Sequence, residues 1–313
     1  MNWKIESLRD AYSRTLIDLG HRDERVMVFD ADLSSSTKTW RFGKEFPERF
    51  FNMGISEQSM VTAAAGAALS GKVVFASTFA VFLSRAYEQI RQSICYNRAN
   101  VKFVTTHAGI TVGEDGATHQ MIEDVGIMSG LPVMSVVVPA DSVETVSMLY
   151  FLHDKTDGPF YVRLSREKFP VINDDDYEFR LGHSTTLRDG SDLTIFSYGA
   201  TVSLSLQASE ILASRGVDAR VINMSSIKPL DSDAVIKASV DTGRIITVEE
   251  HSIINGLGSR VAEVLSENKP SRLVRMGMRD EFGKSGHSWE LFDYFHIGVD
   301  DIVKTSEKLM KEV

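Results

Sequence analysis

The sequence predicts an α/β protein with two domains, each built on a mostly parallel sheet flanked by helices. Short apolar runs alternate with longer segments of helical periodicity. Uninterrupted apolar strands between helices are typical of a parallel sheet that is covered on both faces. A polar segment interrupts this alternation past the middle of the chain. The 313 residues, 43% of them hydrophobic, provide enough material for two cores.

The first half of the chain contains the longer series of alternating elements. Apolar residues at helical spacing predict helices, and short runs rich in Val, Ile and Phe predict strands. The expected helices are residues 4–19, 56–70, 83–97, 119–129 and 141–153. The expected strands are residues 26–29, 72–75, 101–104, 133–138 and 160–162. We expect these elements to form a first domain over residues 1–170.

The second predicted domain follows a polar linker. Residues 171–188 are polar and contain the acidic run Asp174–Asp176, so we expect them to connect two domains. The alternation then resumes, and a smaller α/β domain is expected over residues 189–313. Its predicted elements are strands at 193–197, 218–222 and 244–248 and a helix at 201–215.

Composition and charge exclude several classes of protein. The net charge of −9 is spread along the chain, apart from acidic runs at 174–176 and 249–250, so no nucleic-acid surface is expected. The amino terminus lacks the apolar segment of a signal peptide, and no apolar run reaches the ~18 residues that span a membrane. We expect no membrane contact and a cytoplasmic location. The single cysteine, Cys95, permits neither an intrachain disulfide nor a cysteine metal cluster and is expected to be an inert core residue.

Polar residues gather where the predicted strands of the first domain end. Open α/β sheets bind their ligands at the carboxyl ends of parallel strands. We therefore expect the chemistry of this chain to lie at this edge, in four segments of the first domain. These segments are residues 29–36, 51–60, 75–85 and 105–120.

Glu57 stands between a short apolar segment and an alanine-rich helix. Ser56 occupies the expected N-cap position of that helix, and Gly71 its expected C-terminal stop. Taken alone, a glutamate in a first helical turn is a favourable charge at the positive end of the helix dipole. At a ligand-binding edge it is also a candidate for catalysis.

The glycine-rich segment 105–120 carries His107, Asp115 and His119 without any apolar periodicity that would bury them as core residues. The alternative is a polar surface loop whose histidines cap helices. The string Gly-Glu-Asp-Gly-Ala-Thr-His-Gln at 113–120 resembles the signature of transketolases along its whole length. On this resemblance the chain is identified as a member of the thiamine diphosphate-dependent transketolase family. The resemblance implies that His107 lies near the substrate and its phosphate, that Asp115 contacts a donor hydroxyl, and that His119 handles protons and substrate oxygens.

The resemblance also implies roles at the cofactor. Glu57 matches the glutamate that hydrogen-bonds N1′ of the aminopyrimidine and so activates thiamine diphosphate. Phe79 and Phe82 match aromatic positions that line or stack on the pyrimidine ring. Asp32 matches an acid near the cofactor. The alternatives are two core phenylalanines at helical spacing and, for Asp32, a turn residue after a strand.

Phosphate recognition is expected from arginine, whose planar guanidinium offers parallel donors. The segment Leu164–Arg166 resembles the Leu-Ser-Arg element of transketolases, which makes Arg166 the expected phosphate ligand. Arg9 and Ser36 match a second Arg and a Ser that contact the same phosphate. Both also have ordinary alternatives, because an Arg on an amphipathic helix and a Ser in a loop are common surface features.

Arg85 departs from the transketolase pattern. The segment 82–89 is more similar to that of 1-deoxyxylulose-5-phosphate synthases and places Arg85 where many transketolases have a Tyr near the pyrimidine. Thr106 and His107 are transketolase-like, because the synthases usually have Asp-Arg there. Arg85 is therefore an expected neighbour of the cofactor, and the donor substrate is left open.

The resemblance extends from residue 5 to 313 and leaves out half of the cofactor site. Thiamine diphosphate enzymes bind the diphosphate and Mg²⁺ through Gly-Asp-Gly and a later Asn, whereas the Asp-Gly pairs of this chain lack the preceding Gly. Because the chain starts with its own Met and a first helix, it resembles the C-terminal subunit of a split transketolase. This implies an N-terminal partner subunit that carries the diphosphate domain and the Mg²⁺ or another divalent ion, in an α2β2 heterotetramer. No metal ligands are expected in this chain.

The second domain offers less chemistry. Residues 248–261 place Gly256 and Gly258 ahead of a helix but lack the full Gly-x-Gly-x-x-Gly spacing of a dinucleotide site. We assign this loop to helix packing and dimer contacts. His251 and His287 are expected to be structural.

The expected function is transfer of a two-carbon ketol unit from a ketose phosphate to an aldose phosphate, a reaction of the pentose phosphate pathway. A 1-deoxyxylulose-5-phosphate synthase-like or 2-oxoacid dehydrogenase β-like subunit is one alternative and would consume a 2-oxoacid such as pyruvate. A specialised sugar-phosphate transketolase subunit is a second. A non-enzymatic scaffold is a third, and it would gain no activity when the partner is added.

Overall fold

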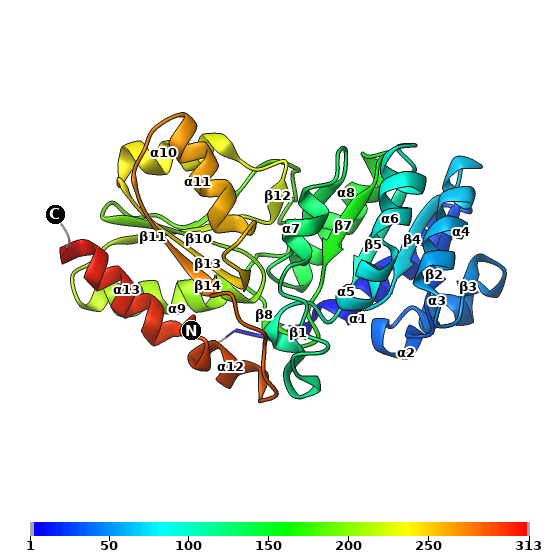
Figure 1. The fold of residues 1–313 in the computed structure, drawn as a ribbon, viewed down its shortest axis with the longest axis horizontal. Coiled ribbons are helices and arrows are strands. Elements are labelled where there is room, and N and C mark those ends of the chain that lie inside the picture. The colour runs from blue at the N-terminus through cyan, green and yellow to red at the C-terminus, as the bar shows by residue number, and fades with distance from the viewer. Residues whose placement is uncertain (1–2, 312–313) are drawn as a thin grey trace.

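The computed structural model describes residues 3–311, so the outermost residues of the predicted domains, 1–2 and 312–313, lie outside the described residues. Two main sheets lie side by side along the long axis of the molecule, that of the first domain on the right of Figure 1 and that of the second on the left. Within the part of the chain that the structure describes, no helix is both long and apolar enough to cross a membrane.

The first domain is built on a seven-stranded sheet with the order β12-β6-β7-β5-β4-β2-β3. Every neighbouring pair is parallel except β12 with β6. The predicted mostly parallel sheet is therefore confirmed. Its strands are β2 (Val26–Asp30), β3 (Phe50–Asn52), β4 (Val73–Ser77), β5 (Val101–Thr105), β6 (Ser135–Val137), β7 (Phe160–Arg163) and β12 (Ser226–Lys228).

Helices cover both faces of this sheet. The helices are α1 (Leu8–Arg22), α2 (Ser34–Thr37), α3 (Trp40–Glu45), α4 (Glu57–Leu69), α5 (Ala80–Leu83), α6 (Tyr87–Gln89), α7 (Asp124–Ser129) and α8 (Ser142–Asp154). Along β4, Val73 and Phe75 join a core cluster with α1 and α8, whereas Val74 and Ala76 join a second cluster with α4. Because both faces are covered, every residue of β4 is buried.

Three predicted helices differ from the structure. The helix expected from residue 4 begins only at Leu8, because Ser7 caps it by accepting a hydrogen bond from the Asp10 amide. Residues before it form strand β1 (Ile5–Ser7), which pairs antiparallel with β8 (Lys168–Pro170). The helix expected at 119–129 is confined to α7. The helix expected at 83–97 is divided among α5, α6 and the short segments η2 (Ser84–Ala86) and η3 (Ile90–Cys95), the latter a π-helix that ends at the buried Cys95.

The second domain has a five-stranded sheet with the order β14-β13-β10-β11-β9, parallel except for β11 with β9. Helices α10 and α11 lie above this sheet in Figure 1, and α9 and α13 lie below it. The strands are β9 (Thr185–Arg188), β10 (Leu193–Ser197), β11 (Ala219–Asn223), β13 (Arg244–Ser252) and β14 (Arg272–Met278). The helices are α9 (Ala200–Ser214), α10 (Ser232–Asp241), α11 (Leu257–Glu267), α12 (Ser288–Tyr294) and α13 (Val299–Lys311).

At the junction of the two domains, one strand from the second half of the chain joins the sheet of the first domain. Strand β9 lies at the end of the segment predicted as a linker and pairs with β11. Strand β12, which follows β11 in sequence, crosses back and extends the first sheet at β6. The division at residues 1–170 and 189–313 stays a prediction.

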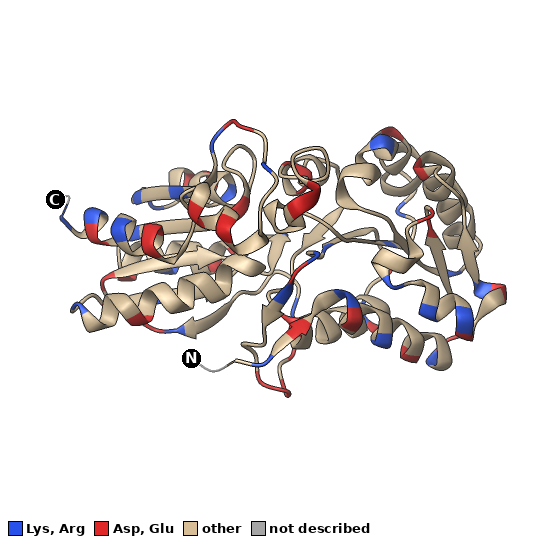
Figure 2. Ribbon diagram, turned by 90° about the horizontal axis from the view of Figure 1, so that it is seen from below, with Lys and Arg blue, Asp and Glu red and all other residues tan. Residues whose placement is uncertain are grey.

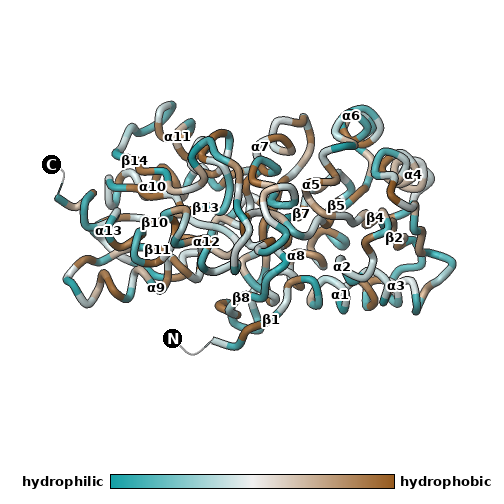
Figure 3. The backbone as a smooth tube through the Cα atoms, turned by 60° about the horizontal axis from the view of Figure 1, so that its bottom comes forward, coloured by the Kyte–Doolittle hydropathy of each residue, from teal (hydrophilic) through white to brown (hydrophobic). Residues whose placement is uncertain are grey.

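The surface of the molecule carries both acidic and basic residues, and its helices turn their hydrophobic residues inward. Along α13, hydrophobic and hydrophilic residues alternate at helical spacing, as Figure 3 shows, and its buried positions are Ile302, Val303, Ser306 and Leu309. Figure 2 shows acidic and basic residues interspersed over both domains. Any anion-binding site must therefore come from a local cluster of basic side chains.

Candidate active site

The predicted site residues follow the carboxyl ends of parallel strands in the first sheet. Strand β2 leads to Asp32, β4 to Phe79, β5 to His107 and β7 to Arg166. Parallel strands end at the same edge of a sheet, so segments far apart in sequence meet there. An isolated β-bridge between Phe79 and Thr106 continues the pairing of β4 and β5 into this edge.

Glu57 is a buried carboxylate at the first residue of α4, with 3% of the residue exposed. The N-cap residue Ser56 makes no side-chain bond to the helix backbone, because its hydroxyl donates to the Ser59 hydroxyl instead. Arg85 Nε is 3.7 Å from Glu57 Oε2, and among residues 3–311 no group donates a hydrogen bond to this carboxylate. A buried carboxylate with open acceptor positions can bind an N–H donor of a ligand.

Two phenylalanines and two histidines form a continuous aromatic cluster. The ring of Phe79 stacks on His107 with centroids 3.7 Å apart, and on Phe82 with centroids 5.5 Å apart. Phe82 meets the ring of His119 edge to face at 5.6 Å. The structure thus brings together four residues that were predicted from two separate segments. Phe82, which is only partly buried, is the phenylalanine of this cluster that is more accessible to a flat apolar ring.

His107 is held in a neutral form. Burial lowers its pKa to about 3, and the positive charges of Arg9 and Arg166 act in the same direction. Its residue is 3% exposed, its backbone adopts a positive φ of 57°, and its Nδ1 is 2.8 Å from the Thr106 hydroxyl. A neutral imidazole in this position can accept or donate a hydrogen bond to a substrate oxygen.

Arg9 joins the other two residues of the predicted phosphate site. Its Nη1 donates to the Ser36 carbonyl at 3.0 Å, and its Nη2 donates to the Arg166 carbonyl at 2.8 Å. Burial lowers the pKa of Arg9, and the nearby charge of Arg166 lowers it further. Two neighbouring guanidinium groups are stabilised by an anion between them. The cluster therefore has the charge that phosphate binding requires.

Arg166 is itself engaged by the loop that carries Asp115. Its Nη1 donates to the Val112 carbonyl at 2.6 Å and to Glu114 Oε2 at 2.9 Å, and lies 3.7 Å from Asp115 Oδ1. Among the described residues, its Nη2 and Nε have no hydrogen-bond partner, so these two donors are open to a phosphate. Asp115 is exposed beside them.

Asp32 lies at the rim of the edge rather than inside it. It is exposed, has a positive φ of 63°, and exchanges hydrogen bonds with the Asn52 side chain. The buried acid nearby is Asp30, which accepts hydrogen bonds from the Leu33 amide and the Thr37 hydroxyl. Burial raises the pKa of Asp30. Asp30 shapes the turn, and the role of Asp32 near a cofactor stays a prediction.

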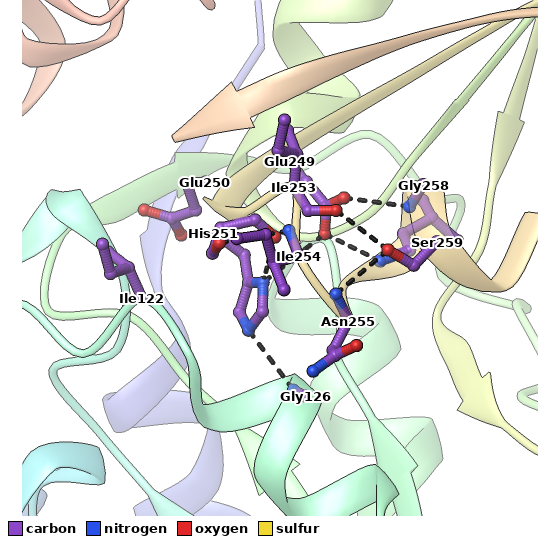
Figure 4. A network of polar contacts seen from close by, with 12 residues as sticks. Ile122, Gly126, Glu249, Glu250, His251, Ile253, Ile254, Asn255, Gly258 and Ser259 are labelled. Atoms are coloured by element: carbon purple, nitrogen blue, oxygen red, sulfur yellow. Dashed lines mark hydrogen bonds and ion pairs between the residues drawn. The ribbon is translucent and has the colours of Figure 1, made fainter. Parts of the chain in front are cut away.

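Behind the edge, a buried ion network joins the two domains. Arg163 Nε donates to Asp124 Oδ2 at 2.8 Å, and its Nη1 donates to Glu250 Oε1 at 3.3 Å. All three side chains are at most 1% exposed. Figure 4 shows Glu250 beside Glu249 and His251 at the end of β13. The acidic pair that the sequence presents as a charged run is fully buried.

The two histidines that were predicted to be structural, His251 and His287, lie in different environments. His251 Nδ1 donates to the Ser252 carbonyl at 2.7 Å and its Nε2 accepts from the Gly126 amide at 3.3 Å (Figure 4), contacts that suit the predicted structural role. Burial lowers the pKa of His251. His287 is largely exposed, and its Nδ1 lies 3.3 Å from Glu114 Oε1.

Two family models match this chain. "Transketolase, pyrimidine binding domain" matches residues 6–171, and "Transketolase, C-terminal domain" matches residues 182–302. The chain belongs to the transketolase family.

Several transketolase relatives have the same extent as this chain. A protein of Methanocaldococcus jannaschii, described only as a transketolase C-terminal section, is 46% identical over 98% of this chain and 97% of its own length. One subunit of an apulose-4-phosphate transketolase from Phocaeicola vulgatus is 40% identical over 97% of each chain. A solved structure described as a split gene transketolase, inactive β4 tetramer, is 44% identical with a TM-score of 0.91, over 97% of this chain and 98% of that one.

Transketolases depend on thiamine diphosphate, and this chain fits one half of that cofactor. The open carboxylate of Glu57 suits the N–H donor of an aminopyrimidine, and the partly exposed ring of Phe82, which is stacked on Phe79, suits its ring. Among residues 3–311, no group of three or more His, Cys, Asp or Glu side chains is arranged to hold a metal ion. Glu57 and the two phenylalanines are the residues that fit the pyrimidine end of the cofactor.

No local sequence motif marks the buried residues that lie behind the predicted site. Arg163, Asp124 and Glu250 carry no local motif, and Arg163 and Glu250 are 87 positions apart in sequence. One feature of the sequence does indicate a buried acidic group. Two adjacent glutamates at the end of the apolar strand β13 follow residues that are buried on both faces, which is an unusual place for exposed charges.

Proposed function

We propose that this chain is the C-terminal subunit of a split transketolase and transfers a two-carbon ketol unit from a ketose phosphate to an aldose phosphate. The proposal depends mainly on the buried Glu57 carboxylate, which is open to a hydrogen-bond donor. It lies at the same edge of the sheet as the aromatic cluster. Thiamine diphosphate would supply the nucleophilic carbon that adds to the ketose carbonyl.

The side chains of this subunit would orient the cofactor and the substrates. Glu57 would hold a proton at N1′ of the aminopyrimidine, and Phe79 and Phe82 would fix the plane of that ring. Arg85 is mostly exposed and would stand at the entrance, near Glu57. Asp32 would lie farther out, beside the cofactor.

A second group of side chains would bind the sugar phosphate. The neutral ring of His107 and the ring of His119 would contact substrate oxygens and move protons at them, and Asp115 would accept a hydrogen bond from a donor hydroxyl. Arg166, with Arg9 and Ser36 behind it, would hold the phosphate. The burial of His107 supports its neutral form at pH 7.

The other half of the site would come from an N-terminal transketolase subunit. That partner would bind the diphosphate and Mg²⁺ or another divalent ion, because this chain lacks the Gly-Asp-Gly motif. An α2β2 heterotetramer in the cytoplasm is the assembly that we propose. The relative described as an inactive β4 tetramer supports a subunit that self-associates and lacks activity alone.

A specialised sugar phosphate is the second candidate substrate. The apulose-4-phosphate transketolase relative from Phocaeicola vulgatus is 40% identical to this chain over nearly its whole length. Its name supports a donor other than a common pentose phosphate, and the exposed Arg85 is a position at which the two choices could differ.

The test is to purify the tagged full-length chain with its bound partners from its native cells and to compare donors. Xylulose 5-phosphate and ribose 5-phosphate would be supplied with thiamine diphosphate and Mg²⁺, and pyruvate would be the alternative donor. Ketol transfer by the complex supports the proposal. Pyruvate consumption would instead favour a synthase-like or dehydrogenase-like subunit, and a complex without any turnover of sugar or 2-oxoacid would favour a scaffold.

A further inference from the structure

A carboxylate of the second domain lies between the two segments that carry the predicted substrate ligands. Glu250 Oε2 accepts a hydrogen bond from the Thr111 amide at 3.1 Å. Glu250 Oε1 accepts a hydrogen bond from the Ser165 hydroxyl at 3.3 Å. Thr111 stands midway between His107 and Asp115 in sequence, and Ser165 directly precedes Arg166. One side chain therefore connects the loop at residues 107–120, which we call the substrate loop, to the end of β7.

The carboxylate is buried and lies against the guanidinium of Arg163. Glu250 is 0% exposed, and Arg163 donates from Nη1 to its Oε1 at 3.3 Å and from Nη2 to its backbone carbonyl at 3.1 Å. Asp124 accepts a hydrogen bond from the Nε of the same guanidinium. In such a site the hydrogen bonds to a charged acceptor are strong, and leaving one of the groups unpaired is unfavourable.

The loop is shaped to approach this carboxylate closely. Gly109 has a positive φ of 74°, and a Cβ added there would lie 2.4 Å from Glu250 Oε2. The peptide of Thr111 is also held from its other side, because its carbonyl accepts a hydrogen bond from the Ser288 hydroxyl at 3.1 Å. Both Glu250 and Ser288 belong to the second domain, so that domain holds the middle of the substrate loop.

We propose that Glu250 is a positioning residue for ketol transfer: it fixes His107 and Asp115 on their loop relative to the phosphate ligand Arg166. The inference rests on the proposed function for the roles of these three residues. Glu250 does not reach the edge where substrate would bind, and it acts through the Thr111 amide and the Ser165 hydroxyl. The second domain is thereby part of the active site's support.

The test compares Glu250→Gln with a matched control, Glu144→Gln. An amide can accept at only one of its two ends, so Gln at 250 would turn an N–H toward either Thr111 or the Ser165 side. Glu144 is equally buried and also ties the first domain to later parts of the chain. Its carboxylate accepts hydrogen bonds from the Ala140 amide, the Tyr177 hydroxyl and the Asn223 side-chain amide, and none of these groups lies in a site segment.

The first readout is backbone hydrogen exchange of residues 107–120 in the full-length chain, which requires no activity. Glu250→Gln is expected to speed exchange in this loop by roughly tenfold, and Glu144→Gln is expected to leave the loop unchanged. Unchanged exchange in Glu250→Gln, or equal acceleration in both variants, would overturn the proposal. If Glu250→Gln does not fold, Glu250→Asp keeps the charge beside Arg163, shortens the reach by one methylene, and must show the same loop-specific increase.

The second readout is steady-state kinetics of the complex with its partner. The KM for the phosphorylated donor is expected to rise by roughly tenfold in Glu250→Gln, with a smaller change in kcat, whereas Glu144→Gln should alter neither. A fall in kcat with KM unchanged would contradict a role in placing the substrate ligands. The wild-type complex could show no ketol transfer while Glu250→Gln still speeds hydrogen exchange in the loop. That result would refute the proposed function but would support the role of Glu250 in positioning the loop.

Discussion

The guanidinium of Arg85 lies beside the carboxylate of Glu57, with 3.7 Å between Nε and Oε2. The two side chains differ sharply in environment, because that of Arg85 is 64% exposed and that of Glu57 is 4% exposed. The distance is too long for a hydrogen bond. Glu57 is therefore a buried acid whose charge is only loosely compensated within this chain, and its acceptor positions are open to a ligand.

Replacement of Glu57 by Gln is expected to reduce turnover of the assembled enzyme by about 10²-fold or more, because an amide cannot hold the proton at N1′ as a carboxylate does. Assembly with the partner should be unaffected. The measurement is ketol transfer together with gel filtration of the complex. The control is Glu88→Gln, which alters an exposed acid on the nearby helix α6. Near-normal turnover in Glu57→Gln would refute the role.

Replacement of Arg85 by Ala should have a much smaller effect. An exposed ion pair contributes roughly 0–1 kcal/mol, so the thermal midpoint should hardly move and kcat/KM should fall by less than about tenfold. The measurement is kcat/KM for several donors in the complex. A loss as large as that of Glu57→Gln would mean that Arg85 acts directly in the reaction.

His107 should stay neutral across the working pH range. Its pKa is lowered to about 3 in the folded chain from an ordinary value of 6.5, so the folded state binds fewer protons than the unfolded state between these values. Stability should consequently rise with pH through this window and be lost toward pH 3. Ring NMR signals assigned with a His107→Gln variant should not shift between pH 5 and pH 8. A titration midpoint near the ordinary histidine value would contradict the buried, neutral ring.

The buried Glu249 should give the opposite pH dependence. Burial raises its pKa from 4.5 to about 7, although the Leu257 and Gly258 amides, which donate at 2.8 and 2.9 Å, act to lower it. The folded state therefore binds more protons than the unfolded state in this window. The corresponding stability is complete below pH 4.5 and is lost as the pH rises through about 7. Urea midpoints should decline from pH 5 to pH 8 more steeply for the wild type than for Glu249→Gln, and parallel curves would count against the raised pKa.

Replacement of Gly109 by Ala should destabilise the chain because it combines backbone strain with a steric conflict. The added Cβ would lie 2.4 Å from Glu250 Oε2, and we expect a loss of roughly 2 kcal/mol or more in the free energy of unfolding. Gly54→Ala is the matched control, since Gly54 shares a positive φ but has nothing within 4 Å of an added Cβ. It should cost about 1 kcal/mol. Equal losses in urea unfolding would show that the contact with Glu250 is unimportant.

Local sequence signals predicted much of the fold but failed for elements whose conformation depends on tertiary contacts. The helix expected at 56–70 is α4, because its alanines favour helix and Gly71, with a φ of 91°, follows its C-cap residue Ser70. The helix expected at 83–97 contains no Gly or Pro, so its pattern gave no reason to expect the π-helical segment η3. Strand β12 is invisible to local patterns because its partner β6 is far away in sequence.

The site also contains residues that a local motif could identify and residues that only the folded structure brings together. His107, Asp115 and His119 share one short string, so a resemblance could identify them together. The contact between Arg163 and Glu250 joins two domains and depends on the packed structure. Residues that bind a ligand can share a motif, whereas residues that hold them in place are selected by geometry from distant parts of the chain.

Ketol transfer by this subunit can be followed directly with a labelled two-carbon unit. Xylulose 5-phosphate labelled with ¹³C at its first two carbons would be mixed with ribose 5-phosphate, thiamine diphosphate and Mg²⁺, and label would be traced by NMR. We expect label to reach the acceptor sugar when this chain and its partner are present together, and not with either alone or with Glu57→Gln. Transfer by this chain alone, or equal transfer by the Glu57→Gln complex, would contradict this expectation.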